Sequence, residues 1–148
     1  MMETNPAAAH AVMGGVFIVI ALIGIAIMLI PAIFYCLTLQ KALTRVAPEN
    51  RAMAPGMVWL LFIPLFNIVW NFMVVLNMAK SLGAEFKQRN IPSEPEPGKG
   101  LGLAMCILAC CGIIPVVNWF SGIATLVCWI MYWVKISAFS SKLAAPSA

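Results

Sequence analysis

Long apolar segments dominate the pattern of hydrophobic and polar positions along this chain. Three stretches, Val12–Tyr35, Met57–Met78 and Leu101–Val134, contain no Asp, Glu, Lys or Arg. A helix rises about 1.5 Å per residue, so about 20 apolar residues cross the hydrocarbon core of a bilayer. The pattern therefore predicts an all-α integral membrane protein, with a single transmembrane helical domain over residues 1–148.

The last apolar stretch is too long for one span, and Pro115 and Asn118 divide it into two. We therefore expect a small helical bundle of four apolar segments, at approximately 12–35, 57–78, 101–117 and 119–136. Between the second and third segments, residues 79–100 carry charges and three prolines, which predicts a polar linker. Leu82 and Phe86 share one face of the charged helix expected at its start.

The second segment allows two topologies, because Pro64 and Asn67 lie near its middle. If it crosses fully, the chain has four spans, and six of the nine basic residues lie in the cytoplasm. If it folds back at Pro64–Asn67, the chain has three full spans and a re-entrant segment, and all nine are cytoplasmic. The positive-inside rule favours the second arrangement. In both, the C-terminus and the basic linker are cytoplasmic.

Composition supports the membrane interpretation. Hydrophobic residues make up 63% of the chain and charged residues only 9%, against about 45–50% and about 25% in soluble domains. The net charge of +4 comes from Lys and Arg residues between and beyond the apolar stretches, where they are the ordinary topology signal. We therefore expect the lipid bilayer, and no nucleic acid, as a partner.

A few polar or helix-bending residues lie within the apolar segments. The candidates are Pro64, Asn67, Asn71, Pro115 and Asn118. Asn67 and Asn71 are one helical turn apart and share a face. They could line a neutral pathway, since polar groups in lipid are costly and often functional. Hydrogen bonds between helices are the simpler interpretation, and the spans contain no ionisable group for a proton relay.

Redox or metal chemistry has weak support. Cys106 and Cys110, at i and i+4, could share a soft metal ion or act as a thiol pair, but the chain lacks a Cys-x-x-Cys motif. Cysteine is also a common packing residue in apolar surroundings. His10 is the only histidine, and no nucleophile–base pair is evident. We expect no catalytic residue, no metal and no cofactor, and hence no enzyme.

Small residues spaced four apart are the clearest sign of close helix packing, because they let two backbones approach. Such packing favours an oligomer or a larger complex. The candidate packing positions are Gly100, Ala104, Cys106, Cys110, Ser121 and Thr125.

The stretch Asn50–Asn67 contains Arg51, then Pro55-Gly56, then Trp59, and then Pro64-x-x-Asn67. It resembles the signature of an uncharacterised family of small bacterial multi-span inner-membrane proteins, and the basic helix that follows also resembles that family. The resemblance covers about a third of the chain. It implies a multi-pass protein of the bacterial cytoplasmic membrane and implies no catalytic activity.

Three functions are compatible with these features. The favoured hypothesis is a non-enzymatic membrane protein that acts through association, as a homo-oligomer or as an accessory subunit of a larger membrane complex. The second is an oligomeric channel or small-solute transporter. The third, and the least favoured, is a thiol or copper redox protein.

Overall fold

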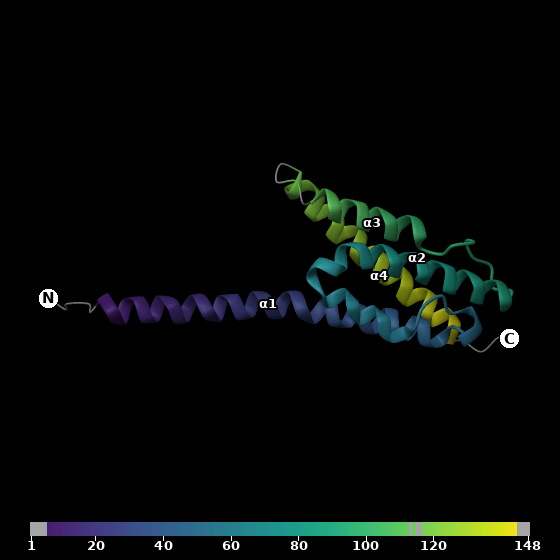
Figure 1. Ribbon diagram of the computed structural model, residues 1–148, viewed down its shortest axis with the longest axis horizontal. Coiled ribbons are helices and arrows are strands. Elements are labelled where there is room, and N and C mark those ends of the chain that lie inside the picture. Colours follow the sequence, from purple (N-terminus) through teal and green to yellow (C-terminus); the bar gives the residue numbers. More distant parts are fainter. Residues whose placement is uncertain (1–5, 113, 115–116, 145–148) are drawn as a thin grey trace. The chain divides into compact units, whose positions relative to one another are not determined.

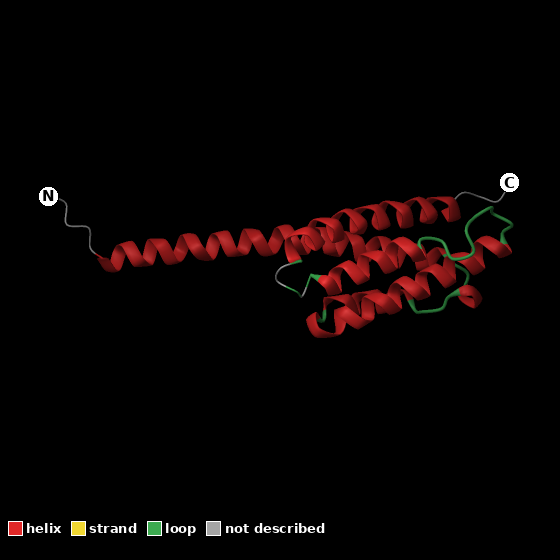
Figure 2. Ribbon diagram, turned by 90° about the horizontal axis from the view of Figure 1, so that it is seen from above, coloured by secondary structure: helices red, strands yellow, loops and turns green. Residues whose placement is uncertain are grey.

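The computed structural model describes residues 6–112, 114 and 117–144, and these residues form helices and no strand (Figure 2). This confirms the all-α prediction; Pro115 lies outside the described residues. The chain begins with helix α1 (Pro6–Arg45), which is followed by two 3₁₀ helices, η1 (Pro48–Asn50) and η2 (Pro55–Phe62). Three further α-helices follow: α2 (Pro64–Gln88), α3 (Lys99–Cys111) and α4 (Asn118–Ala144).

The chain divides into two compact units, residues 1–35 and 36–148. In the first unit, every residue from His10 to Ile30 is exposed. The helix is apolar over this length and presents no polar face to water, as expected of a helix whose solvent is lipid.

Among the described residues, three helices are long and apolar enough to cross a membrane: residues His10–Arg45 of α1, then α2 and α4. Helix α3 has 13 residues, or about 20 Å, and is shorter than a usual span. Of the third apolar segment, expected at 101–117, the residues up to Cys111 belong to α3. Helix α4 instead continues past the expected end at 136 to Ala144.

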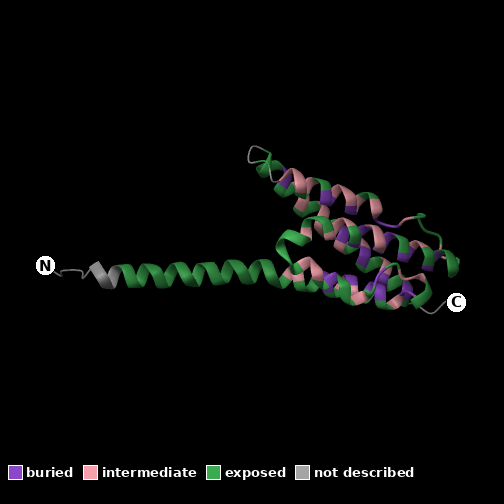
Figure 3. Cartoon of the chain, in the orientation of Figure 1, coloured by how far each residue is buried: buried purple, intermediate pink, exposed green. Residues whose placement is uncertain are grey.

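The second unit contains the last turns of α1 and all later elements. Helix α3 packs beside both α2 and α4 (Figure 1). Helix α2 supplies a larger share of the core than any other element: Val74, Met78, Leu82 and Phe86 are fully buried at intervals of four residues (Figure 3). The expected apolar face at Leu82 and Phe86 is confirmed, and one helical turn explains the spacing.

The second apolar segment is not one helix. Element η2 and helix α2 fold back on each other around Ile63 and Pro64, and the indole nitrogen of Trp70 donates to the carbonyl of Met57 at 2.9 Å. Pro64 begins α2, and the preceding residue is extended, as proline requires. The bend precedes the predicted site at Pro64–Asn67, since Asn67 already lies in the first turn of α2.

The linker is irregular between Ile91 and Gly98, as expected, but its end is buried. Gly98 has a φ of 80°, a left-handed conformation that favours glycine, and it lies against the ring of Tyr132. Farther back, the carbonyl of Pro95 lies against Gly83 of α2. The linker is therefore packed onto α2 and α4 at these points rather than fully solvated.

Gly102 is a point of close approach between α3 and its neighbours. A Cβ atom there would lie 2.5 Å from a methyl of Val75 on α2 and 2.9 Å from the ring of Tyr132 on α4. By contrast, a Cβ atom at Gly100 would meet nothing within 4 Å. The small residue that lets these three helices meet is therefore Gly102.

Replacing Gly102 with Ala should lower the free energy of unfolding by about 1–3 kcal/mol, because the added methyl overpacks the contact with Val75 and Tyr132. Thermal or denaturant unfolding of the purified chain in detergent measures this. Gly100→Ala is the matched control and should cause no loss, since an alanine favours the helix there. Equal effects of the two substitutions would contradict the assigned contact.

Candidate functional site

The most unusual group in the second unit is a buried carboxylate, Glu85, whose side chain is 2% exposed. It lies in the polar last part of α2, where Met78, Leu82, Glu85 and Arg89 follow one another at helical spacing. That spacing directs Glu85 into the core beside Leu82. A charge in such a place is costly unless it is paired and hydrogen-bonded.

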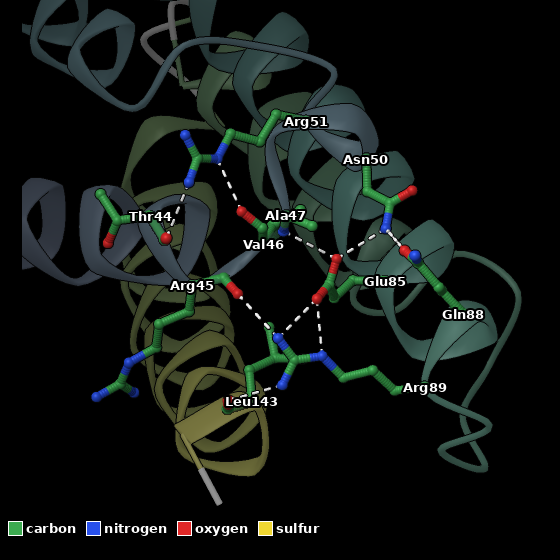
Figure 4. A network of polar contacts seen from close by, with 10 residues as sticks. All are labelled: Thr44, Arg45, Val46, Ala47, Asn50, Arg51, Glu85, Gln88, Arg89 and Leu143. Atoms are coloured by element: carbon green, nitrogen blue, oxygen red, sulfur yellow. Dashed lines mark hydrogen bonds and ion pairs between the residues drawn. The ribbon is translucent and has the colours of Figure 1, made fainter. Parts of the chain in front are cut away.

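Three hydrogen bonds and an ion pair satisfy the carboxylate (Figure 4). Oε1 accepts from Nε of Arg89 at 2.7 Å, and Nη2 of the same guanidinium pairs with Oε1 at 2.7 Å. Oε2 accepts from the backbone N–H of Ala47 at 2.9 Å and from the side-chain amide of Asn50 at 2.8 Å. Each carboxylate oxygen therefore has two nitrogen contacts within the chain. Asn50 also donates to the side-chain oxygen of Gln88.

Three arginines extend this cluster by binding the last carbonyls of helices α1 and α4. Arg89 donates to the carbonyls of Leu143 at 3.0 Å and Arg45 at 3.3 Å. Arg51 binds the carbonyls of Val46 and Thr44. Helix C-termini carry unpaired carbonyls and partial negative charge, which guanidinium groups satisfy.

The third arginine, Arg45, donates to the carbonyl of Ser140 at 2.6 Å and to its hydroxyl at 2.8 Å. We call this set the Glu85 junction; it consists of Arg45, Asn50, Arg51, Glu85 and Arg89 with the atoms they bind. It connects α1 and η1, which are neighbours in the sequence, with α2 and α4, which are far from them in the sequence.

Further polar contacts hold the same elements together. The hydroxyl of Ser81 accepts from the N–H of Ala52 at 2.9 Å and donates to the carbonyl of Asn77. The indole of Trp133 donates to the hydroxyl of Thr38 at 2.9 Å, between α4 and α1. These contacts join the ends of α1, α2 and α4 to the turn that follows α1, so the buried carboxylate and its partners hold elements of the same chain together.

The predicted polar positions lie elsewhere. Asn71 precedes Glu85 by 14 residues, about 21 Å along α2, and Asn67 lies farther away. Asn118 is exposed at the start of α4. The side-chain oxygens of Asn71 and Thr125 are buried and have no hydrogen-bond partner among the described residues.

The predicted packing positions differ in their surroundings. Cys106 and Ser121 are buried, Ala104, Cys110 and Thr125 are half-buried, and Gly100 is exposed. All five cysteines are free. Within the described ranges, no three of His, Cys, Asp and Glu come together.

None of the residues of the Glu85 junction is among the site residues predicted from the sequence. For Glu85 and Arg89 a signal was present, because both continue the face marked by Leu82 and Phe86. A carboxylate at a core position, with an arginine one turn later, indicates a buried pair. The donors from Ala47 and Asn50 had no such signal, since they depend on where the chain folds back.

Comparison of the chain with protein-family models, with curated proteins and with solved structures finds no match. The resemblance based on Arg51, Pro64 and Asn67 therefore stays a prediction.

Glu85→Ala should lower the free energy of unfolding by about 3–5 kcal/mol, because it leaves Arg89, Asn50 and the Ala47 N–H without their acceptor. Denaturant unfolding in detergent measures the loss. Glu49→Ala is the control, since Glu49 is exposed in η1 and its removal should change stability by about 0.5 kcal/mol or less. Similar effects of the two substitutions would show that the junction is not a stabilising clamp.

Proposed function

We propose that this chain is a non-enzymatic integral membrane protein that acts through association. It forms a homo-oligomer or serves as an accessory subunit of a larger complex in the bacterial cytoplasmic membrane. The observation that carries the proposal is the apolar surface of α1 from His10 to Ile30, where every residue is exposed. An apolar surface of this length requires a cover, which we assign to lipid and to the helices of partner chains.

The glycines of α1 favour the helix of a partner chain, in addition to lipid, against the exposed apolar surface of α1. A Cβ atom at Gly14, Gly15 or Gly24 would meet nothing within 4 Å, so another backbone has room to approach. Close approach at small residues is the usual basis of helix association in lipid, where apolar side chains alone give little preference for a partner.

The proposed arrangement in the bilayer follows from the distribution of charge. All nine basic residues belong to the second unit. They lie around the Glu85 junction, in the last turns of α1, α2 and α4, at the start of α3 and before η2. We assign this end to the cytoplasm, with η2 and the first half of α2 as a re-entrant pair.

The Glu85 junction supports a structural role for the polar end of the second unit, by which we mean the end where the basic residues lie. Its carboxylate and its arginines are engaged with backbone groups of the same chain, so they fix the positions of α1 and α4. A rigid cytoplasmic end would present the apolar surface of the bundle to partners in a constant geometry.

The test is the mass of the full chain extracted in mild detergent from its native membrane, for wild type and for Gly14→Leu/Gly24→Leu. We expect a particle larger than one chain, and at least tenfold weaker association in the variant, or about 1.4 kcal/mol. Gly122→Leu on α4 is the matched control, because Gly122 is also exposed with open space around it. A wild-type particle of one chain alone would contradict the proposal.

A further inference from the structure

Four lysines, one from each α-helix, lie at nearly the same level of the second unit. Two contacts fix that level. Gly102 of α3 lies against both Val75 of α2 and Tyr132 of α4. The indole of Trp133 also donates to the hydroxyl of Thr38 on α1.

On each helix, a lysine lies within about a turn and a half of these contacts, on the side toward the Glu85 junction. Lys80 lies about 7.5 Å beyond Val75, and Lys135 lies about 4.5 Å beyond Tyr132. Lys99 lies about 4.5 Å from Gly102 in the same sense, because α3 begins at this end. Lys41 lies about 4.5 Å beyond Thr38. We call these four residues the lysine belt.

The belt coincides with the edge of the exposed apolar surface. The last large exposed apolar residues before the junction are Leu37 on α1, Met73 on α2 and Val134 on α4. The lysine that follows on each helix is a member of the belt. In a bilayer, this boundary is where the hydrocarbon ends and the phosphate groups of the lipids begin, and lysine side chains extend to that depth.

The charges of the belt are only partly neutralised. Two glutamates of the linker reach it: Lys99 pairs with Glu96 at 2.5 Å, and Lys135 pairs with Glu94 at 3.4 Å. Lys41 and Lys80 are exposed, and neither has an acidic partner in the part of the chain that the structure describes. The second unit has nine basic and four acidic residues, a net charge of +5.

The arginines do not share this availability. Arg45, Arg51 and Arg89 are all engaged with carbonyls or with Glu85 inside the junction. Lys41 and Lys80 are therefore the cations that remain for an external anion at the edge of the apolar surface.

We propose that the lysine belt binds the phosphate groups of anionic lipids in the cytoplasmic leaflet, with Lys41 and Lys80 as the main contacts. Glu94 and Glu96 weaken this binding by occupying the other two lysines. The inference rests on the proposed placement in a membrane and adds the class of lipid that the polar end selects.

The test uses the full chain reconstituted into phosphatidylcholine vesicles that contain a trace of spin-labelled phosphatidylglycerol or phosphatidylcholine. Electron paramagnetic resonance gives the relative association of each label with the protein. We expect a preference for phosphatidylglycerol, which Lys41→Gln/Lys80→Gln reduces by up to about fivefold per lysine. Glu94→Gln/Glu96→Gln should increase the preference.

The matched control is Lys87→Gln/Lys142→Gln, which removes the same charge. Each of these lysines lies seven residues, or about 10 Å, beyond a belt lysine on its helix. The control should retain most of the preference. An equal loss in both pairs would overturn the proposal, since it would reflect net charge alone.

Two further outcomes are distinguishable. If the vesicle-bound chain resists extraction by carbonate but shows no preference for phosphatidylglycerol, the belt proposal fails and the membrane placement stands. If the chain is extracted by carbonate, the membrane placement itself fails. A preference that inorganic phosphate abolishes, and sodium chloride of equal ionic strength does not, would indicate a site for a free anion and overturn the lipid assignment.

Discussion

The carboxylate of Glu85 sets the condition that the polar end of this protein must satisfy. A buried charge is tolerated only where hydrogen bonds replace the water it has lost. Here the three hydrogen-bond donors come from Ala47, Asn50 and Arg89, so the chain after α1 must return to the side of α2. The turn between α1 and η2 is thereby fixed, and with it the direction in which η2 leaves the junction.

This constraint also divides the basic residues into two groups. The arginines point inward and bind the carbonyls at the ends of α1 and α4, where a planar guanidinium can serve several acceptors at once. The lysines point outward at the edge of the apolar surface or beyond it. In the sequence, arginine and lysine both appear only as positive charges. In the structure, the arginines are bonded to backbone carbonyls and, within the described residues, the lysines are not.

Much of the architecture could be predicted from the sequence, because membrane helices have a strong and simple signature. The charge-free stretches identified α1, α2 and α4, and the proline at position 64 marked the break in the second segment. The length of α3 could not be predicted, since the apolar residues of the sequence continue beyond Cys111, where α3 ends. Lipid-facing and helix-facing residues look alike in such a stretch.

The contacts between elements were harder to predict. The spacing of small residues pointed to Gly100, but the close approach occurs at Gly102, because only the rotation of α3 decides which glycine faces Val75 and Tyr132. Likewise, the spacing of Glu85 from Leu82 indicated a core position, but its partners from residues 47 and 50 depend on the fold of the turn. The periodicity of a short segment shows which face of a helix is buried. Which other helix that face packs against depends on the fold of the whole chain.

In the proposed topology, the polar ends of the helices lie on one side of the membrane, and η2 and α2 fold back on each other within it. The most direct test maps the two termini with reporters fused to each end of the full chain in its native membrane. We expect the N-terminus and the C-terminus to lie on opposite sides of the membrane, with the C-terminus in the cytoplasm. Both termini on the same side would contradict it.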